Sequence, residues 1–158
     1  TGVQTCALPI CNVTNLRDTF SYSQINPLIS EWDVSNVTTM NQMFNYNPYF
    51  NQDLSRWDVS NVTSLRWMFH EAHRFTSDLS NWDVSSATNA SWMFNNAHAF
   101  NSDLASWSTG SLTDVDSMFY RAYNFTNNDL SSWDVSNVEN HDNFLKKAGE
   151  GNIEPNWP

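Results

Sequence analysis

The chain has 158 residues, enough for one domain with a continuous core, and 15% of them are aromatic, which excludes a disordered composition. Seven Lys and Arg residues stand against seventeen Asp and Glu residues. The formal net charge of −10 argues against nucleic acid or an anionic membrane as partner, because both need a basic surface. No apolar run approaches the roughly 18 residues that span a bilayer, so no membrane insertion is expected within this fragment.

The first ten residues do not resemble the rest of the chain. Residues 1–10 (TGVQTCALPI) are similar to a translated sequencing-adapter stretch, and we interpret them as an artefact rather than as part of the fold. A genuine N-terminal extension is the alternative. Without Cys6, Cys11 stands alone and no disulfide framework can be argued. Residues 11–20 match the second half of a repeat unit, so we expect this chain to be part of a longer repeat protein.

Residues 11–148 consist of a repeat of about 25 residues. The same string returns around each of five tryptophans: EWDVSNVTTM from Glu31, RWDVSNVTSL from Arg56, NWDVSSATNA from Asn81, SWSTGSLTDV from Ser106 and SWDVSNVENH from Ser132. An apolar pair follows each string, as at Met68-Phe69. A single unit of this size cannot bury its aromatic residues, whereas stacked units can. Residues 149–158 lose the pattern and are expected to form a tail or cap.

Two periodicities alternate within each unit. Leu54, Trp57 and Val59 follow an L-x-x-L-x-L pattern, which predicts a short strand with Trp57 and Val59 on its core side. Apolar residues at 62, 65, 68, 69 and 72 lie at helical spacing, and Ser60 or Asn61 before them is a natural N-cap. We therefore expect an α/β fold, a right-handed leucine-rich-repeat-like solenoid with one short parallel strand and one helix in each of about five repeats.

The string W-D-V-S-N-V-T-x-M-x-x-M-F resembles the bacterial surface-protein repeat of BspA-like leucine-rich-repeat proteins and of the mycoplasma surface family of unknown function. The resemblance covers about Cys11 to Ala148. It implies a secreted or cell-surface protein that takes part in adhesion and protein binding. It implies no particular chemistry, because these families are defined by their architecture. The unit around Ser106 departs from the pattern at Ser108, Thr109 and Gly110.

The residues between Trp and Val of each strand are expected to point away from the core. This exposed strand face, with flanking positions, is the candidate binding face; its members are Asp33, Arg56, Asp58, Asn81, Asp83, Ser108 and Asp134. Neighbouring carboxylates in the Asp column would repel one another. Hydrogen bonds from nearby Ser and Asn, or a bound Ca²⁺, would relieve that repulsion.

Tryptophans occur in two settings. Trp57, Trp82, Trp107 and Trp133 occupy the repeating frame and are expected in the core. Trp67 and Trp92 stand immediately before the apolar pair, where other units carry Gln42 and Ser117. This position predicts partial exposure on the helix side, so both residues join the candidate binding face.

No pattern of catalytic residues is visible. The chain has only four Gly and no phosphate-binding loop, and no nucleophile–base–orienter set can be assigned, so we expect no enzyme activity and no cofactor. His70 and His73 lie three apart and His98 lies one repeat beyond His73, but no third ligand is apparent. We interpret these histidines as solvated residues on the helix face, with no metal.

These observations favour an extracellular or cell-surface module that binds a protein or glycan on a cell or matrix surface. Two alternatives remain. Thr38, Thr63, Thr88 and Thr113 are in phase and could form an ice- or mineral-binding surface, although capping of the predicted helix also explains them. The array could also be a passive structural spacer.

Overall fold

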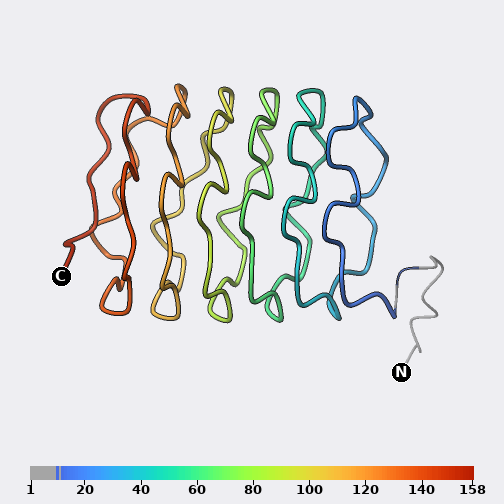
Figure 1. Cartoon of the computed structure of the whole chain (residues 1–158), viewed down its shortest axis with the longest axis horizontal. Coiled ribbons are helices and arrows are strands. Elements are labelled where there is room, and N and C mark those ends of the chain that lie inside the picture. Colours follow the sequence, from blue (N-terminus) through green and yellow to red (C-terminus); the bar gives the residue numbers. More distant parts are fainter. Residues whose placement is uncertain (1–9, 11) are drawn as a thin grey trace.

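The computed structural model describes residue 10 and residues 12–158, which form a row of stacked coils (Figure 1). Parallel bridges connect the same position in successive coils: Asn15–Thr39, Thr39–Ser64, Ser64–Asn89, Asn89–Asp114 and Asp114–Asn140. Each sequence repeat is therefore one coil. Equivalent residues of successive coils lie next to one another, and we call such a set a column.

The prediction of one strand and one helix in each repeat is wrong. Within residue 10 and residues 12–158 there is no helix, and β pairing is limited to isolated bridges. The bridges lie where the helix was predicted to start, whereas the predicted strand at 54–59 contains a turn in which the Trp57 amide donates to the Leu54 carbonyl at 3.0 Å. The described chain is thus not an α/β solenoid of leucine-rich-repeat type. It also contains no helix that could cross a membrane.

The segment predicted as a helix is a series of tight turns. Alternate amides point to the next coil, as the Phe69 amide does to the Met93 carbonyl at 2.9 Å. The amides between them bond three residues back, as His70 does to Trp67 at 3.2 Å. Trp67 and Glu71 have φ angles of 61° and 60°, in the left-handed region, which interrupts any helix. The apolar spacing of three residues is therefore the spacing of successive turns.

Aromatic columns fill the core. Phe69 lies between Phe44 and Phe94 with ring centroids 5.6 Å away on each side and nearly parallel planes. Trp82 is 3% exposed, and its indole N–H donates to the Leu54 carbonyl of the preceding coil at 3.0 Å. Other tryptophans in this column are buried and bonded in the same way: Trp57, Trp107 and Trp133. The prediction that these four tryptophans lie in the core is confirmed.

Residues 149–158 pack against the last coil. Ile153 forms a parallel bridge with Asp129, and the Leu130 amide donates to the Ile153 carbonyl at 2.9 Å. The Trp157 ring packs edge-on against Phe144, with centroids 5.0 Å apart. This contact covers the end of the aromatic core. The adapter interpretation concerns residues that, except for Ile10, lie outside the described part of the chain, as do Cys6 and Cys11.

Candidate functional site

The polar residues of the predicted binding face are all exposed, but they lie in turns and irregular segments rather than on a strand. Asn81, Asp83 and Ser108 come together at the edge of one shallow hollow of about 390 Å³. Trp82 also contributes to this hollow, although its side chain is almost completely buried. The structure thus places part of the predicted face around a common hollow, lined mainly by hydroxyl, amide and carboxylate groups.

The carboxylates of the Asp column are held by their own turns. Asp58 accepts the Ser60 amide at 3.1 Å and the Ser60 hydroxyl at 2.6 Å. The corresponding Ser hydrogen bonds lower the pKa of Asp33, Asp83 and Asp134 below its ordinary value. Among the described residues, no group of three or more His, Cys, Asp or Glu side chains could hold a metal ion. Local hydrogen bonds are therefore the stabilising contacts that the structure provides for these charges.

A second surface is aromatic and centres on Trp67 and Trp92. Both are partly exposed, and their ring centroids lie 5.4 Å apart in neighbouring coils. The ring of His70 lies against both, at 5.1 Å from Trp67 and 5.9 Å from Trp92. Tyr46 packs edge-on against His70, and Tyr22 stacks on Tyr46 with centroids 4.9 Å apart. We call these five residues, Tyr22, Tyr46, Trp67, His70 and Trp92, the aromatic face.

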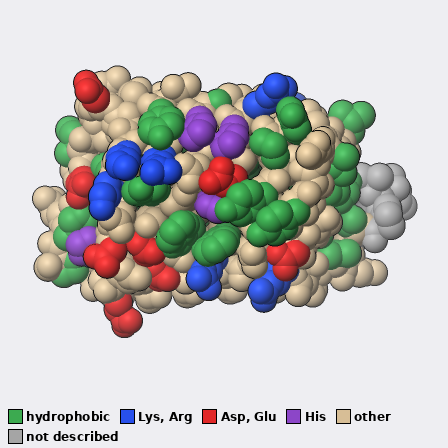
Figure 2. All heavy atoms as spheres, turned by 45° about the horizontal axis from the view of Figure 1, so that its top comes forward, with side chains coloured by type: hydrophobic (Ala, Val, Ile, Leu, Met, Phe, Trp, Pro, Cys, Tyr) green, Lys and Arg blue, Asp and Glu red, His purple; other side chains and the backbone are tan. Residues whose placement is uncertain are grey.

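Figure 2 shows one side of the molecule on which hydrophobic and histidine side chains gather, with basic and acidic side chains around them. Two tyrosines of the aromatic face contribute much of its exposed surface, since Tyr22 is 72% exposed and Tyr46 is 42% exposed. Large exposed aromatic residues are enriched where proteins bind other molecules. The aromatic face is therefore the strongest candidate binding surface among the described residues.

The Trp pair belongs to a column in which every residue has a positive φ. Its members are Asp18, Gln42, Trp67, Trp92, Ser117 and Asn143, with φ between 52° and 61°. Asp and Asn adopt this left-handed conformation readily, whereas a bulky residue does so at a cost. Tryptophan is thus poorly suited to the backbone here, and neighbouring coils demonstrate that smaller polar residues suffice.

The two residues that flank the Trp pair in this column leave open space. A hollow of about 240 Å³ lies on the Gln42 side and is lined by Arg17, Asn41, Gln42, Arg66 and Trp67. A second hollow, of about 470 Å³, lies on the Ser117 side and includes Trp92, Asp116, Asn140 and Asp142. Each indole therefore borders one hollow, and the two indoles pack against each other between them.

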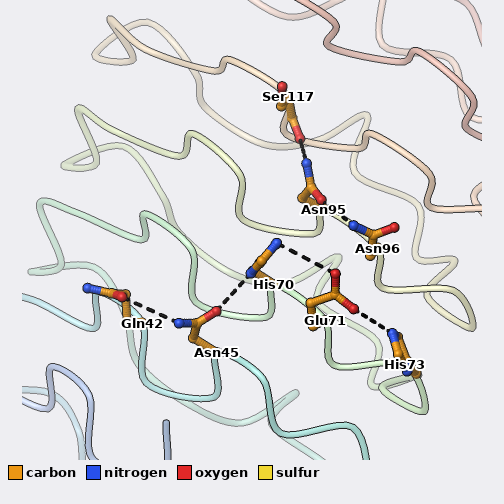
Figure 3. Close-up of polar contacts among 8 residues, drawn as sticks. All are labelled: Gln42, Asn45, His70, Glu71, His73, Asn95, Asn96 and Ser117. Atoms are coloured by element: carbon orange, nitrogen blue, oxygen red, sulfur yellow. Dashed lines mark hydrogen bonds and ion pairs between the residues drawn. The ribbon is translucent and has the colours of Figure 1, made fainter. Parts of the chain in front are cut away.

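The histidines do not match the prediction in full. His70 is buried rather than solvated, and its Nδ1 lies 2.8 Å from Asn45 Oδ1. Burial lowers the pKa of His70, with a smaller opposite effect from Glu71. Glu71 connects His70 to His73, at 3.9 Å and 2.7 Å respectively (Figure 3). The prediction failed because the turns direct residue 70 against Trp67 and Trp92, whereas a helix would have left it on the surface.

A second aromatic column adjoins the aromatic face through Glu71. His73 and His98 stack with centroids 4.4 Å apart, and Tyr123 continues the column 4.8 Å from His98. Burial and the neighbouring His73 lower the pKa of His98. These residues, and Tyr22 and Tyr46, were not predicted as site residues. The available signal was their recurrence at the repeat spacing, which places equivalent side chains in contact.

A family described as "Mycoplasma protein of unknown function, DUF285" matches residues 7–97 and 56–157. Comparisons with curated proteins and with solved structures give no match. The match confirms the mycoplasma-family part of the resemblance and does not establish a BspA-like leucine-rich-repeat identity. The two matched segments together span almost the whole chain, and the chain therefore belongs to the DUF285 family.

Proposed function

We propose that this chain is an extracellular or cell-surface binding module that recognises a macromolecule through the aromatic face. The partly exposed Trp67–Trp92 pair is the observation that carries the proposal. Two indoles occupy backbone positions where Gln42 and Ser117 fit other coils, although a bulky side chain adopts this left-handed conformation at a cost. Core packing does not require these two indoles, because the core is already filled by the Phe columns and by the inner Trp column, which consists of Trp57, Trp82, Trp107 and Trp133.

The binding surface in this proposal differs from the exposed face first expected. The carboxylates of the Asp column are occupied by hydrogen bonds within their own turns, as in Asp58 with Ser60. The aromatic face instead offers apolar area that gains free energy when it is removed from water. Partner classes consistent with such a surface are a protein or a glycan on a cell or matrix surface.

A cell-binding measurement tests this proposal. Fluorescently labelled chain is titrated onto intact epithelial cells and bound label is measured by flow cytometry. Saturable binding is expected, and the double variant Trp67→Gln, Trp92→Ser should lose it, because these are the residues that neighbouring coils carry in the same column. The pair Asp58→Asn, Asp83→Asn on the other surface is the matched control and should bind normally. Absence of saturable binding, or loss only in the Asp variants, would contradict the proposal.

One observation favours a second candidate, an ice- or mineral-binding surface. The Thr column forms a regular ladder in which the Thr63 hydroxyl donates to the Thr38 carbonyl at 3.1 Å, the Thr88 hydroxyl to Thr63 at 3.2 Å and the Thr113 hydroxyl to Thr88 at 3.1 Å. Each of these hydroxyls donates its hydrogen to a backbone carbonyl. Its oxygen can therefore only accept hydrogen bonds from ordered water. A thermal-hysteresis measurement on the wild type and on Thr63→Val decides this candidate: activity that the variant lacks would favour it.

A further inference from the structure

The Trp67–Trp92 pair is flanked by two hollows that differ in their polar groups. Arg17, Asn41 and Gln42 supply side-chain donors and acceptors beside Trp67, whereas Asp116, Asn140 and Asp142 supply them beside Trp92. Aromatic rings surrounded by a few polar groups are typical of ligand sites. The two hollows are separate, and the packed indoles of Trp67 and Trp92 lie between them along the stack of coils.

The backbone of this site is unavailable to a ligand. The Trp67 and Trp92 amides donate to the Ser91 and Asp116 carbonyls at 3.0 and 2.8 Å. Their carbonyls accept the His70 and Asn95 amides, both at 3.2 Å. A peptide that adds as an extra strand needs free backbone N–H and C=O groups, so a peptide cannot bind to Trp67 and Trp92 in this way. Recognition must rely on indole faces and polar side chains.

The charges around the pair nearly balance. Arg17 and Arg66 border the first hollow, and Arg17 is already paired with Asp18 at 3.2 Å. Asp116, Asp142 and Lys146 border the second hollow. A polyanion would meet carboxylates on one side and a formal net charge of −10 over the whole chain. The site therefore favours a ligand without net charge.

On the basis of the proposed binding function, we infer that the Trp67–Trp92 pair and its two hollows bind a neutral oligosaccharide. A sugar ring has an apolar C–H face, which can pack on an indole, and a rim of hydroxyls, which can bond to amides and carboxylates. One sugar unit packs against Trp67 at the first hollow, where the Arg66 guanidinium lies over the indole at 5.6 Å from its centroid, and another packs against Trp92 at the second hollow. Because two indoles lie between these positions, the two sugar units are not adjacent in the oligosaccharide.

The test is isothermal titration of the full chain with neutral hexasaccharides, which are long enough to reach both hollows. The probes are the β-1,4-linked hexamers of glucose and of N-acetylglucosamine and the α-1,4-linked hexamer of glucose. We expect at least one probe to bind, and Trp67→Gln and Trp92→Ser each to weaken binding by at least about tenfold. Tyr49→Ser, which changes an exposed aromatic residue outside the site, should leave the affinity unchanged. Thermal melts verify that each variant is folded.

A second arm separates failure of this inference from failure of the proposed function. Cells are treated with periodate, which cleaves sugar diols, or with protease, before labelled chain is added. Loss of Trp-dependent binding after periodate supports the inference even if the three probes are not the right sugars. Trp-dependent binding that survives periodate, or a dimer that the Trp variants abolish, overturns it while leaving an aromatic-face binding module in place. If no cell binding and no probe binding occurs, both proposals fail.

Discussion

Trp92 donates its indole N–H to the carboxylate of Asp116 in the next coil, with Nε1 and Oδ2 2.7 Å apart. Trp67, in the same column, has no such acceptor, because Ser91 occupies the position equivalent to Asp116. The Trp67 Nε1 is buried and has no hydrogen-bond partner within the described part of the chain. Two neighbouring indoles on one surface thus differ in one hydrogen bond.

This difference predicts that removal of the indole N–H destabilises the fold more at Trp92 than at Trp67. Trp92→Phe loses a hydrogen bond to a carboxylate and should lower the free energy of unfolding by about 1–2 kcal/mol. Trp67→Phe removes a buried donor without a partner and should change it by less than about 0.5 kcal/mol from this cause. Urea unfolding of both variants measures the two values. Equal losses would mean that Trp67 has an acceptor in solution.

The inner Trp column should dominate stability. Trp82→Ala is expected to cost about 3–5 kcal/mol, because coils on both sides hinder collapse of the cavity. The substitution also leaves the Leu54 carbonyl without the indole donor. Trp67→Ala, at a partly exposed position, serves as the comparison and should cost clearly less. Similar shifts in the thermal midpoint at both positions would contradict the assignment of core and surface tryptophans.

Stability should fall as the pH drops below about 6.5. Burial lowers the pKa of His70 from its ordinary value of 6.5, so the unfolded chain binds the proton more tightly than the folded chain. The contribution of His70 to the free energy of unfolding is complete above pH 6.5. It is lost as the pH falls towards the pKa of His70 in the folded chain, by at most about 1.4 kcal/mol per pH unit for one group. Chemical unfolding between pH 5 and about pH 8 measures the slope.

The variant His70→Asn is the matched control for this pH dependence. Asn45 and Asn95 occupy the same position in neighbouring coils and are fully buried, so Asn is compatible with the site. The variant should show a flatter pH profile between pH 5 and about pH 6.5. The lowered pKa of His98 leaves a residual slope. An unchanged profile would assign the effect to groups other than His70.

Calcium is expected to leave the stability unchanged. The Asp58 carboxylate is held by Ser60 within its own turn, and an Asn side chain can accept the same amide hydrogen bond. Thermal melts with about 2 mM calcium and with chelator should therefore coincide, for the wild type and for Asp58→Asn alike. A calcium-dependent rise in the midpoint that Asp58→Asn abolishes would instead identify a cation site on this surface.

The sequence alone determined the repeat, its phase and most of the buried residues. Spacing of the tryptophans defined the coil, and the off-phase position of Trp67 and Trp92 was enough to predict their partial exposure. These features depend on local pattern, because equivalent residues of identical units must occupy equivalent environments in a stack.

Only the tertiary structure decided between a helix and a series of turns. Apolar side chains three residues apart fit either, and nothing in Trp67 or Glu71 as residue types indicates a left-handed φ. The choice follows from hydrogen bonds between coils: a helix would satisfy its amides internally, whereas here alternate amides, such as that of Phe69, bond to the neighbouring coil. The burial of His70 and the contact between Trp67 and Trp92 follow from that stacking, which joins residues of different repeats and is therefore not contained in any single repeat.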